Sequence, residues 1–330
     1  MASFEKVRTG WRVSVNTKGV RDSSTFSTKI EAQTWASKRE VEIRKFASKG
    51  GATDKYLDDA LTKYSKEVSV EKKGKDWEEV RLLAISAHLV DKKPFGTMLL
   101  HEIDSAVLAR WRDMRLQTVS GSTVNRELNL LSHVFTIARK EWKWILESPT
   151  TDVTRPKNAA ARDRRITEEE IEKLKIAFGF NGEVRTKNHA VMAAFLFAIE
   201  TAMRAGEICW LPWSSIKGSV ATLPAEVNKN GSKRDVPLSP RALEILKMLP
   251  KNGETCFGIT SASLDALYRK ARATTGIDDL KFHDTRHEAI TRLAKKLNVL
   301  ELARMVGHKD LKMLQVYFNP TAEEISDKLK

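Results

Sequence analysis

Four residues near the carboxyl end of the chain have the types and spacing of a reactive centre. His283 and Arg286 lie three residues apart in HDTRH, so a helix that starts there would place them on one face. His308 follows Gly307, a typical helix-ending residue, and Tyr317 comes nine residues later, about two and a half helical turns. A tyrosine at helical spacing is more often a core residue than a nucleophile, so these residues need support from elsewhere in the chain.

A second candidate group lies upstream, in TAMRAGE at residues 201–207. Arg204 follows an apolar helical pattern, and burying a guanidinium there is costly unless it is paired or faces an anion. Glu207, three residues later, can hold that guanidinium in place. Taken alone, a purely structural Arg–Glu pair is the simpler explanation of these two residues.

Basic residues also gather at a predicted hairpin, EVNKNGSKRDVPLS at residues 226–239. Lys229 precedes the Asn-Gly turn, so its ammonium group would sit at the hairpin tip, able to reach a neighbouring site and donate a proton. Lys233 and Arg234 follow on the return strand and are candidate DNA contacts. The alternative is a charged hairpin that is simply exposed to solvent.

Metal chemistry has little support in the sequence. His283 and His287 have the i, i+4 spacing of metal ligands, but HExxH is absent and no third ligand follows at a recognisable spacing. Cys209 and Cys256 form no CxxC pair, which argues against a zinc ribbon and a disulfide framework. We therefore expect no metal site and no cofactor.

The candidate residues form a cationic set around one hydroxyl group: Arg204, Lys229, His283, Arg286, His308 and Tyr317. This set suits phosphoryl transfer to a tyrosine, because guanidiniums bind non-bridging phosphate oxygens and neutralise the charge that grows in the pentavalent state. His308 can donate a further hydrogen bond, and Lys229 can protonate a departing 5′-alkoxide. His283 could accept the phenol proton, and Tyr317 would attack as the covalent nucleophile.

The composition agrees with a DNA-binding protein. The formal net charge is +14, which favours a polyanionic partner, although it could also merely solubilise the surface. The excess is spread out, since residues 1–50 alone hold 11 Lys and Arg against 5 Asp and Glu. There is no apolar run long enough for a membrane span and no signal-peptide pattern at the start. We expect a cytoplasmic, nucleoid-associated protein with no membrane partner.

Periodicity predicts two amino-terminal domains. Residues 4–26 alternate like short strands, and a capping box at Thr28 and Glu31 opens a helix, which together predict a DNA-binding module at residues 1–50. A Gly-Gly linker follows. Residues 56–150 have helical spacing throughout, with a long helix starting at Ser122 or Thr123, and predict a helical domain over 54–150.

A linker over residues 151–166 is predicted from the segment 148–167, which has two prolines and no periodicity. It could follow a phosphate backbone or be an ordinary solvated linker, and its basic residues are Arg155, Lys157, Arg162, Arg164 and Arg165. Thr167 and Glu170 form another capping box and open a mostly helical domain over 167–330, with strands near 220–237. The expected fold class is mainly α with small β elements, α+β.

The boxes together resemble the tyrosine recombinase, or phage integrase, family. TAMRAGE resembles its first arginine box, Lys229 its hairpin lysine, HDTRH its H-x-x-R box, and VGHKDLKMLQVY its G-H…Y box. The resemblance covers about residues 55–330. Residues 1–50 resemble, more loosely, the arm-site-binding domains of lambda-type integrases. One departure is Ala202, where the family usually has glycine.

The resemblance implies strand cleavage through a 3′-phosphotyrosine and exchange through a Holliday junction by four protomers, without ATP. It implies a core-site-binding domain over 54–150, core and arm att sites on double-stranded DNA, and integration or excision of phage or mobile-element DNA. A host DNA-bending protein joins the expected partners, and whether an excision factor takes part stays open. The carboxyl-terminal tail resembles a segment that docks on a neighbouring subunit.

Two rival functions stay open at this point. A type IB topoisomerase uses similar chemistry but rejoins the same strand, and supercoil relaxation would separate it from a recombinase. A non-catalytic DNA-binding regulator would explain the charge and the helices, but not the set of six candidate residues.

Overall fold

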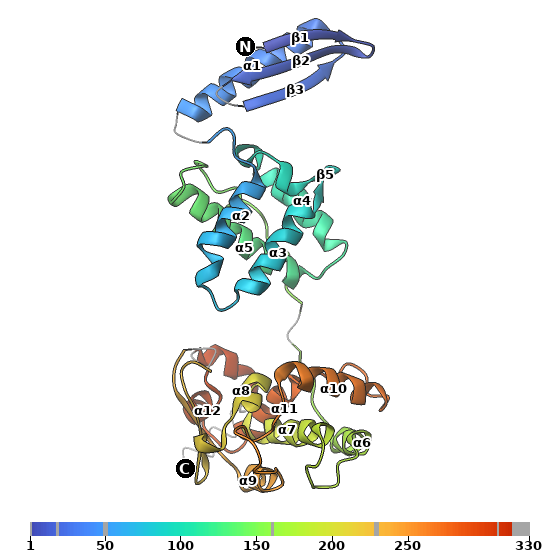
Figure 1. Cartoon of the computed structure of the whole chain (residues 1–330), viewed down its shortest axis with the longest axis vertical. Helices are drawn as coiled ribbons and strands as arrows, with labels where there is room; N and C mark the ends of the chain where they lie inside the picture. The colour runs from blue at the N-terminus through green and yellow to red at the C-terminus, as the bar shows by residue number, and fades with distance from the viewer. Residues whose placement is uncertain are drawn as a thin grey trace, which may run out of the picture. The chain divides into compact units, whose positions relative to one another are not determined.

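The computed structural model describes residues 2–17, 20–48, 52–159, 162–227, 231–308 and 310–318. The chain divides into two compact units, Met1–Ala161 and Arg162–Lys330, each with hydrophobic core clusters of its own. Helices dominate both units and small antiparallel sheets accompany them, which confirms the α+β prediction (Figure 1). No helix within these described ranges has the length and apolar character needed to cross a membrane.

The chain begins with a three-stranded antiparallel sheet in the order β1-β2-β3, and one helix packs on it (Figure 1). Val13 and Val15 of the central strand are fully buried with Ile43 of the helix, because alternate residues of a strand face the same side. The predicted capping box is present, since Thr28 and Glu31 exchange hydrogen bonds of 3.1 and 3.2 Å. The elements are β1 (Ala2–Val7), β2 (Gly10–Thr17), β3 (Val20–Phe26) and α1 (Lys29–Ser48).

Four helices form the rest of this unit around a core that contains Tyr64, Trp111 and Phe135: α2 (Leu57–Glu67), α3 (Lys75–Ala87), α4 (Ser105–Leu116) and α5 (Gly121–Lys140). A single-turn 3-10 helix, η1 (Ser69–Glu71), follows α2. Helix α5 begins at Gly121, one or two residues earlier than predicted, because the Ser120 side chain caps it by accepting from the Thr123 N–H group at 3.4 Å.

The prediction of helix throughout residues 56–150 is wrong between α3 and α4. Two short strands lie there, β4 (Leu89–Val90) and β5 (Lys93–Pro94), followed by the 3-10 helices η2 (Phe95–Thr97) and η3 (Leu100–Glu102). Asp91 and Lys92 have positive φ angles of 51° and 65°, which reverse the chain in a tight turn. Leu83 and Leu89, in and just after α3, are exposed.

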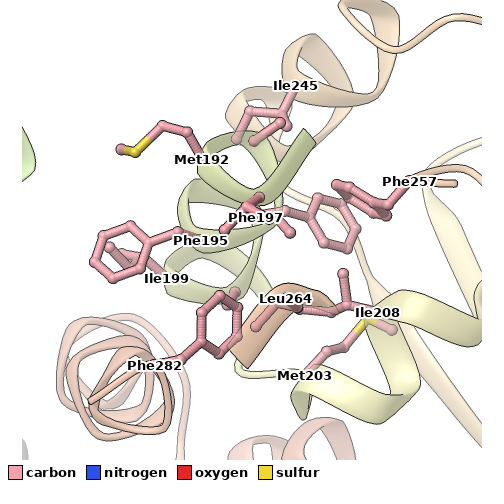
Figure 2. Packing of buried hydrophobic residues seen from close by; sticks show 14 of the residues in the cluster. Met192, Phe195, Phe197, Ile199, Met203, Ile208, Ile245, Phe257, Leu264 and Phe282 are labelled. Carbon is pink, nitrogen blue, oxygen red and sulfur yellow. The ribbon is translucent and has the colours of Figure 1, made fainter. Parts of the chain in front are cut away.

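The second unit is built around α7, which is apolar on nearly all sides and therefore buried. Figure 2 shows Phe195 and Phe197 leaving opposite sides of this helix, toward Phe282 and Phe257, with ring centroids 6.0 and 5.3 Å apart. The helices on the amino-terminal side of the unit are α6 (Glu168–Phe178), α7 (Lys187–Thr201) and α8 (Ala205–Trp210). The predicted capping box at Thr167 and Glu170 opens α6.

A three-stranded antiparallel sheet of order β6-β7-β8 lies between α8 and α9 in the chain, after a single-turn 3-10 helix. It contains the predicted hairpin, and the residues at the tip, 228–230, lie outside the described ranges. The elements are η4 (Trp213–Ser215), β6 (Ile216–Lys217), β7 (Val220–Leu223), β8 (Arg234–Pro237) and α9 (Pro240–Lys247).

The described chain ends with the elements that hold the remaining candidate residues: α10 (Ser261–Ala273), α11 (Asp284–Ala294), α12 (Val299–Val306) and the 3-10 helix η5 (Leu311–Tyr317). Helix α11 packs against the central α7, and α12 contacts strand β8. As predicted, Gly307 ends α12 in the left-handed conformation, with φ 72°. These packings bring the TAMRAGE, hairpin, HDTRH and G-H…Y segments to one region of the unit.

Candidate active site

Arg204 is placed by the sharp end of α7. Ala202 adopts a left-handed φ of 53°, which ends α7 and turns the chain so that Arg204 becomes the amino-terminal cap of α8. The predicted contact with Glu207 is present: Arg204 donates from its backbone N–H at 2.9 Å and from Nη1 at 2.8 Å. Glu207 is only 2 % exposed, so this guanidinium is fixed by a carboxylate that cannot move into solvent.

Arg286 is held by the carboxyl ends of two helices. It lies on α11 and is 5 % exposed, and its Nη1 donates to the Ala202 carbonyl at the end of α7. Its Nη2 donates to the Val306 carbonyl at the end of α12, at 2.7 Å. Terminal helix carbonyls lack partners within their helix and carry the negative end of the helix dipole, so they favour a guanidinium. Burial, followed by the charges of Arg204 and Arg234, lowers the pKa of Arg286 to about 9.

His308 lies beside Arg286 with a defined tautomer. Its Nε2 is 3.0 Å from Arg286 Nη2, and because an arginine nitrogen can only donate, Nε2 must accept. Burial and then the charges of the nearby arginines lower the pKa of His308 to about 4, so the ring is neutral at pH 7. Its single proton is therefore on Nδ1, which is buried without a hydrogen-bond partner in the described part of the chain.

Tyr317 ends the 3-10 helix η5 and is half-buried, with its ring centroid 5.2 Å from that of His287. Burial raises the pKa of Tyr317, while the nearby charge of Arg286 opposes that rise. The phenol is consequently protonated at neutral pH and needs a base before it can attack. His283, the residue before α11, lines one pocket of about 450 Å³ together with Arg204 and Arg286.

A third arginine, Arg234, was missed as a member of this site. It was predicted to be an exposed contact on the return strand, but it is 5 % exposed and points inward. Its Nη2 donates to Glu207 at 2.6 Å, and its Nη1 donates to the Val306 carbonyl at 2.5 Å. The signal was present in the alternation of β8, where Arg234 and Val236 are buried while Asp235 and Pro237 are exposed.

The two lysines of the hairpin segment, Lys229 and Lys233, were also predicted as site residues. Lys229 lies outside the described residues, so its predicted role as the acid stays a prediction. Lys233 is 67 % exposed, with its Nζ 3.9 Å from an Asp235 carboxylate oxygen. Such an exposed, weakly paired lysine leaves the predicted DNA contact open.

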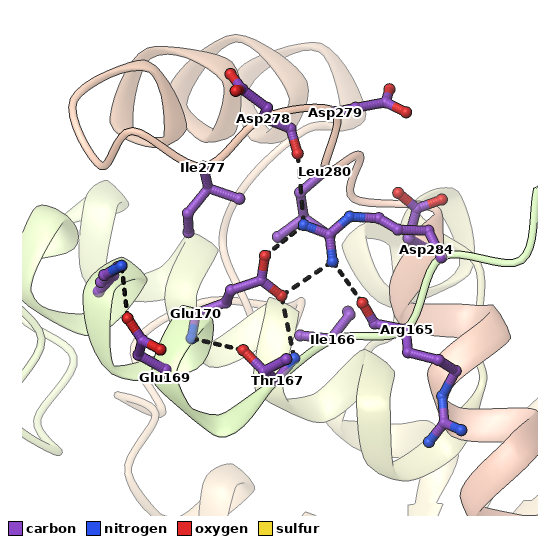
Figure 3. A network of polar contacts seen from close by, with 12 residues as sticks. Arg165, Ile166, Thr167, Glu169, Glu170, Ile277, Asp278, Asp279, Leu280 and Asp284 are labelled. Atoms are coloured by element: carbon purple, nitrogen blue, oxygen red, sulfur yellow. Dashed lines mark hydrogen bonds and ion pairs between the residues drawn. The ribbon is translucent and has the colours of Figure 1, made fainter.

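The basic linker is largely paired with acidic residues of its own unit. Arg162 donates to Asp279 and Asp284 at 2.8 to 3.0 Å, and Arg165 donates to the buried Glu288 at 2.7 Å. Arg164 bonds to Glu170 at the start of α6, and Figure 3 shows Glu170 between Thr167 and the Asp278 segment. These three arginines are therefore paired within the unit, unlike those of an ordinary solvated linker, and their DNA contacts stay a prediction.

The remaining linker residues behave differently. Arg155 donates to the side chain of Asn129 at 2.8 Å and to the Asn125 carbonyl at 3.3 Å, and Lys157 is exposed. Asp163, between the paired arginines, places a carboxylate oxygen 3.4 Å from His287 Nε2. The ring of that histidine also packs on Tyr317, so the linker reaches the tyrosine through one intervening side chain.

Comparison with known proteins identifies the family. Residues 164–324 match the family model of the phage integrase family. A Haemophilus influenzae relative is 38 % identical over 98 % of this chain and 89 % of its own length. The shufflon-specific DNA recombinase of Escherichia coli is 39 % identical over 83 % of this chain and 71 % of its own length. This chain belongs to the phage integrase family. It is a tyrosine recombinase, an enzyme that transfers DNA strands, as the boxes predicted.

Solved structures agree on the fold. A lambda integrase dimer bound to a COC′ core site superposes with a TM-score of 0.68 and 18 % identity, over 96 % of this chain and 94 % of that one. A lambda integrase tetramer bound to a Holliday junction gives a TM-score of 0.65 at 18 % identity, over 93 % and 95 % of the two chains. The fold extends over nearly the whole chain, including the amino-terminal sheet.

Proposed function

We propose that this enzyme is a site-specific recombinase in which Tyr317 forms a 3′-phosphotyrosine with a DNA strand. Strand exchange between two att sites would proceed through a Holliday junction and would integrate or excise phage or mobile-element DNA. The observation that carries the proposal is the convergence of Arg204 and Arg286 beside His308. Tyr317 lies near enough to Arg286 for that positive charge to oppose the rise of its pKa. These groups come from separate segments, and Arg204 and Tyr317 are 113 residues apart in the sequence.

In the proposed reaction, the Tyr317 oxygen attacks the scissile phosphorus and the bond from phosphorus to the 5′ oxygen breaks. His283 accepts the phenol proton, and Lys229 gives a proton to the departing 5′ oxygen, so the charges balance. Arg204, Arg286 and the Nδ1–H group of His308 stabilise the equatorial oxygens of the transition state. A 5′-hydroxyl of the partner duplex then reverses these steps, which conserves the phosphodiester energy and requires no ATP.

The proposal assigns a role to each part of the chain. Residues 1–50 would bind arm-type sites, residues 54–150 the core site, 151–166 would link the domains, and 167–330 would catalyse. The amino-terminal sheet supports the first role, because its helix-free face carries Arg12 and Ser14, opposite Glu5 and Ser3 of β1. A small polar sheet of this kind can enter the major groove and read base edges.

Four protomers would act on two DNA sites. The solved lambda integrase tetramer on a Holliday junction supports this stoichiometry. The tail, residues 319–330, lies outside the described residues, and we propose that it docks on a neighbouring protomer. A host DNA-bending protein and an excision factor are proposed as further partners.

The test is trapping on a nicked suicide substrate that carries the core site. The wild-type protein should form a covalent adduct that mass spectrometry maps to Tyr317, whereas Tyr317→Phe should bind the same DNA without forming the adduct. An adduct on a different residue, or an adduct with the phenylalanine variant, would reject the proposal. Relaxation of supercoils without recombination between two att sites would instead favour the topoisomerase alternative, and binding with no adduct at all would favour a regulator.

A further inference from the structure

Arg234 has the environment of a linking residue. Its side chain is 4 % exposed, and, unlike Arg204 and Arg286, it does not line the pocket of about 450 Å³. Its two terminal nitrogens are both used inside the protein, Nη2 by Glu207 and Nη1 by the Val306 carbonyl. A guanidinium donates in a fixed planar fork, so these two acceptors must keep a fixed separation while both bonds persist.

Each acceptor of Arg234 is shared with a catalytic arginine. Glu207 also accepts from Arg204, at 2.8 Å, and the Val306 carbonyl also accepts from Arg286, at 2.7 Å. The result is a continuous series of hydrogen bonds in the order Arg204, Glu207, Arg234, Val306, Arg286 and His308. Strand β8 thus sits between the two halves of the site.

The same guanidinium explains the glycine before His308. A Cβ added to Gly307 would lie 2.8 Å from Arg234 Nη1 and 3.1 Å from its Cδ, closer than side-chain carbons normally approach. The φ of 72° at this residue is the second reason for glycine. Arg234 and the loop that carries His308 are therefore in direct contact.

We propose that Arg234 is a positioning residue of the recombinase, which sets the separation of Arg204 and Arg286 by sharing one acceptor with each. It does not touch the scissile phosphate. Without it, Glu207 would have Arg204 as its remaining guanidinium partner, and a full carboxylate charge would compete with the phosphate for that arginine. The inference rests on the proposed function, because it assumes that both outer guanidiniums bind the reacting phosphate.

The main experiment compares full-length Arg234→Lys and Arg234→Met with the wild-type enzyme on the suicide substrate. We expect adduct formation to slow by about 10- to 1000-fold, the range for disturbing one or more transition-state donors, with DNA affinity within about threefold. Arg241→Lys, an exposed arginine paired with Glu244, is the control and should cleave at the wild-type rate. Equal cleavage by Arg234→Met and the wild type would overturn the proposal.

A modified substrate separates positioning from loss of folded protein. A methylphosphonate at the scissile position removes the charge that the outer arginines neutralise, so the ratio of wild-type to Arg234→Lys cleavage rates should shrink at least fivefold on that substrate. A merely structural defect would lower both rates by the same factor and leave the ratio unchanged, which would reject the positioning role. If the wild type forms no adduct on either substrate, the proposed function itself has failed.

Gly307→Ala disturbs Arg234 without removing it. Gly179 is the matched control, because it also ends a helix with a positive φ, 63°, but its nearest outside atom is His189 Nε2 at 3.9 Å. Both alanine variants should lose thermal stability through the same backbone strain. Gly307→Ala should also lose adduct formation by at least tenfold, while Gly179→Ala keeps the wild-type rate. Equal cleavage by the two variants would contradict the proposal.

Discussion

Two groups of arginines in the carboxyl-terminal unit differ in how far nearby carboxylates compensate their positive charge. The linker arginines, Arg162, Arg164 and Arg165, each bond to at least one carboxylate. Among the site arginines, Arg204 and Arg234 share the carboxylate of Glu207. Arg286 bonds to two backbone carbonyls and to His308 instead of a carboxylate. Positive charge is compensated in the first group and left in excess in the second.

The pKa shifts express the same difference. Hydrogen bonds to Asp284 and Asp279 raise the pKa of Arg162, and the bond to Glu288 raises that of Arg165. Burial and neighbouring arginines instead lower the pKa of Arg286 and of Arg234. Excess buried charge is costly unless an anion offsets it, so the protein holds at this site a positive potential that a phosphodiester would relieve. The contrast separates arginines whose charge is offset by nearby carboxylates from arginines whose combined charge favours a bound anion.

The largest effect should come from the site group. Arg286→Ala should slow adduct formation by about 10²–10³-fold, since it removes a preorganised donor to the developing charge. Arg164→Gln, from the linker group, should slow it by less than about tenfold, because its partner Glu170 lies at the start of α6. Single-turnover cleavage of the suicide substrate measures both, and similar losses in the two variants would erase the distinction between the groups.

The linker group should dominate stability in acid. Burial alone would raise the pKa of Glu288, but hydrogen bonds from Arg165 and Arg292 lower it from 4.5 to about 2. A depressed carboxylate pKa stabilises the fold above about pH 5, and that stabilisation is lost as the pH falls toward 2. Urea unfolding should therefore show Glu288→Gln less stable by about 3 kcal/mol at pH 7, with the gap closing as the pH falls. A gap independent of pH would show that the pairing with Arg165 and Arg292 contributes little.

His308 reports the excess charge of the site group directly. Nitrogen NMR of the imidazole should show a neutral ring protonated at Nδ1 at pH 6, with titration only near pH 4. Replacing Arg234 with Met removes one nearby charge and should raise that pKa. A ring that is already cationic at pH 6 in the wild type would contradict the charge assignment of the whole group.

The smallest expected effect concerns salt. Each phosphate contact adds about 0.9 to the slope of binding affinity against salt concentration on logarithmic axes. Because the linker arginines already bond to carboxylates, replacing all three with Gln should change this slope by less than about 1. Fluorescence anisotropy over a salt series gives the slope. A change of about 2.7, equivalent to about three phosphate contacts, would show that these arginines leave their carboxylates and bind DNA.

Helix ends that depend on neighbouring residues were predicted correctly from the sequence. The capping boxes at Thr28 and Thr167 and the terminal Gly307 depend on neighbours within a few residues, and all three were found at the predicted places. The α+β class followed from periodicity, and the family from four short boxes. The boundaries were less accurate, as at α5, whose start depends on which of several nearby hydroxyls caps the helix.

Long-range partners could not be read in the same way. Arg162 and Asp284 are 122 residues apart, so no local pattern shows that this linker arginine is paired. Arg234 was predicted to contact DNA because the hairpin is rich in positive charge. Its inward orientation follows from strand alternation, which places it on the same buried face as Val236. The turn at Asp91 and Lys92 was not predicted, because positive φ angles are uncommon outside glycine and neither residue is a glycine.

The Val306 carbonyl accepts hydrogen bonds from both Arg234 and Arg286, so the proposed site is incomplete until this residue has been synthesised. While the chain is still being synthesised, Arg204, Glu207 and Arg234 leave the ribosome well before the end of α12 exists. Until that carbonyl arrives, Arg286 lacks one of its two backbone anchors and His308 has no place beside it. Under the proposed mechanism, we expect a chain truncated before Val306 to lack this shared acceptor and to form no adduct with DNA.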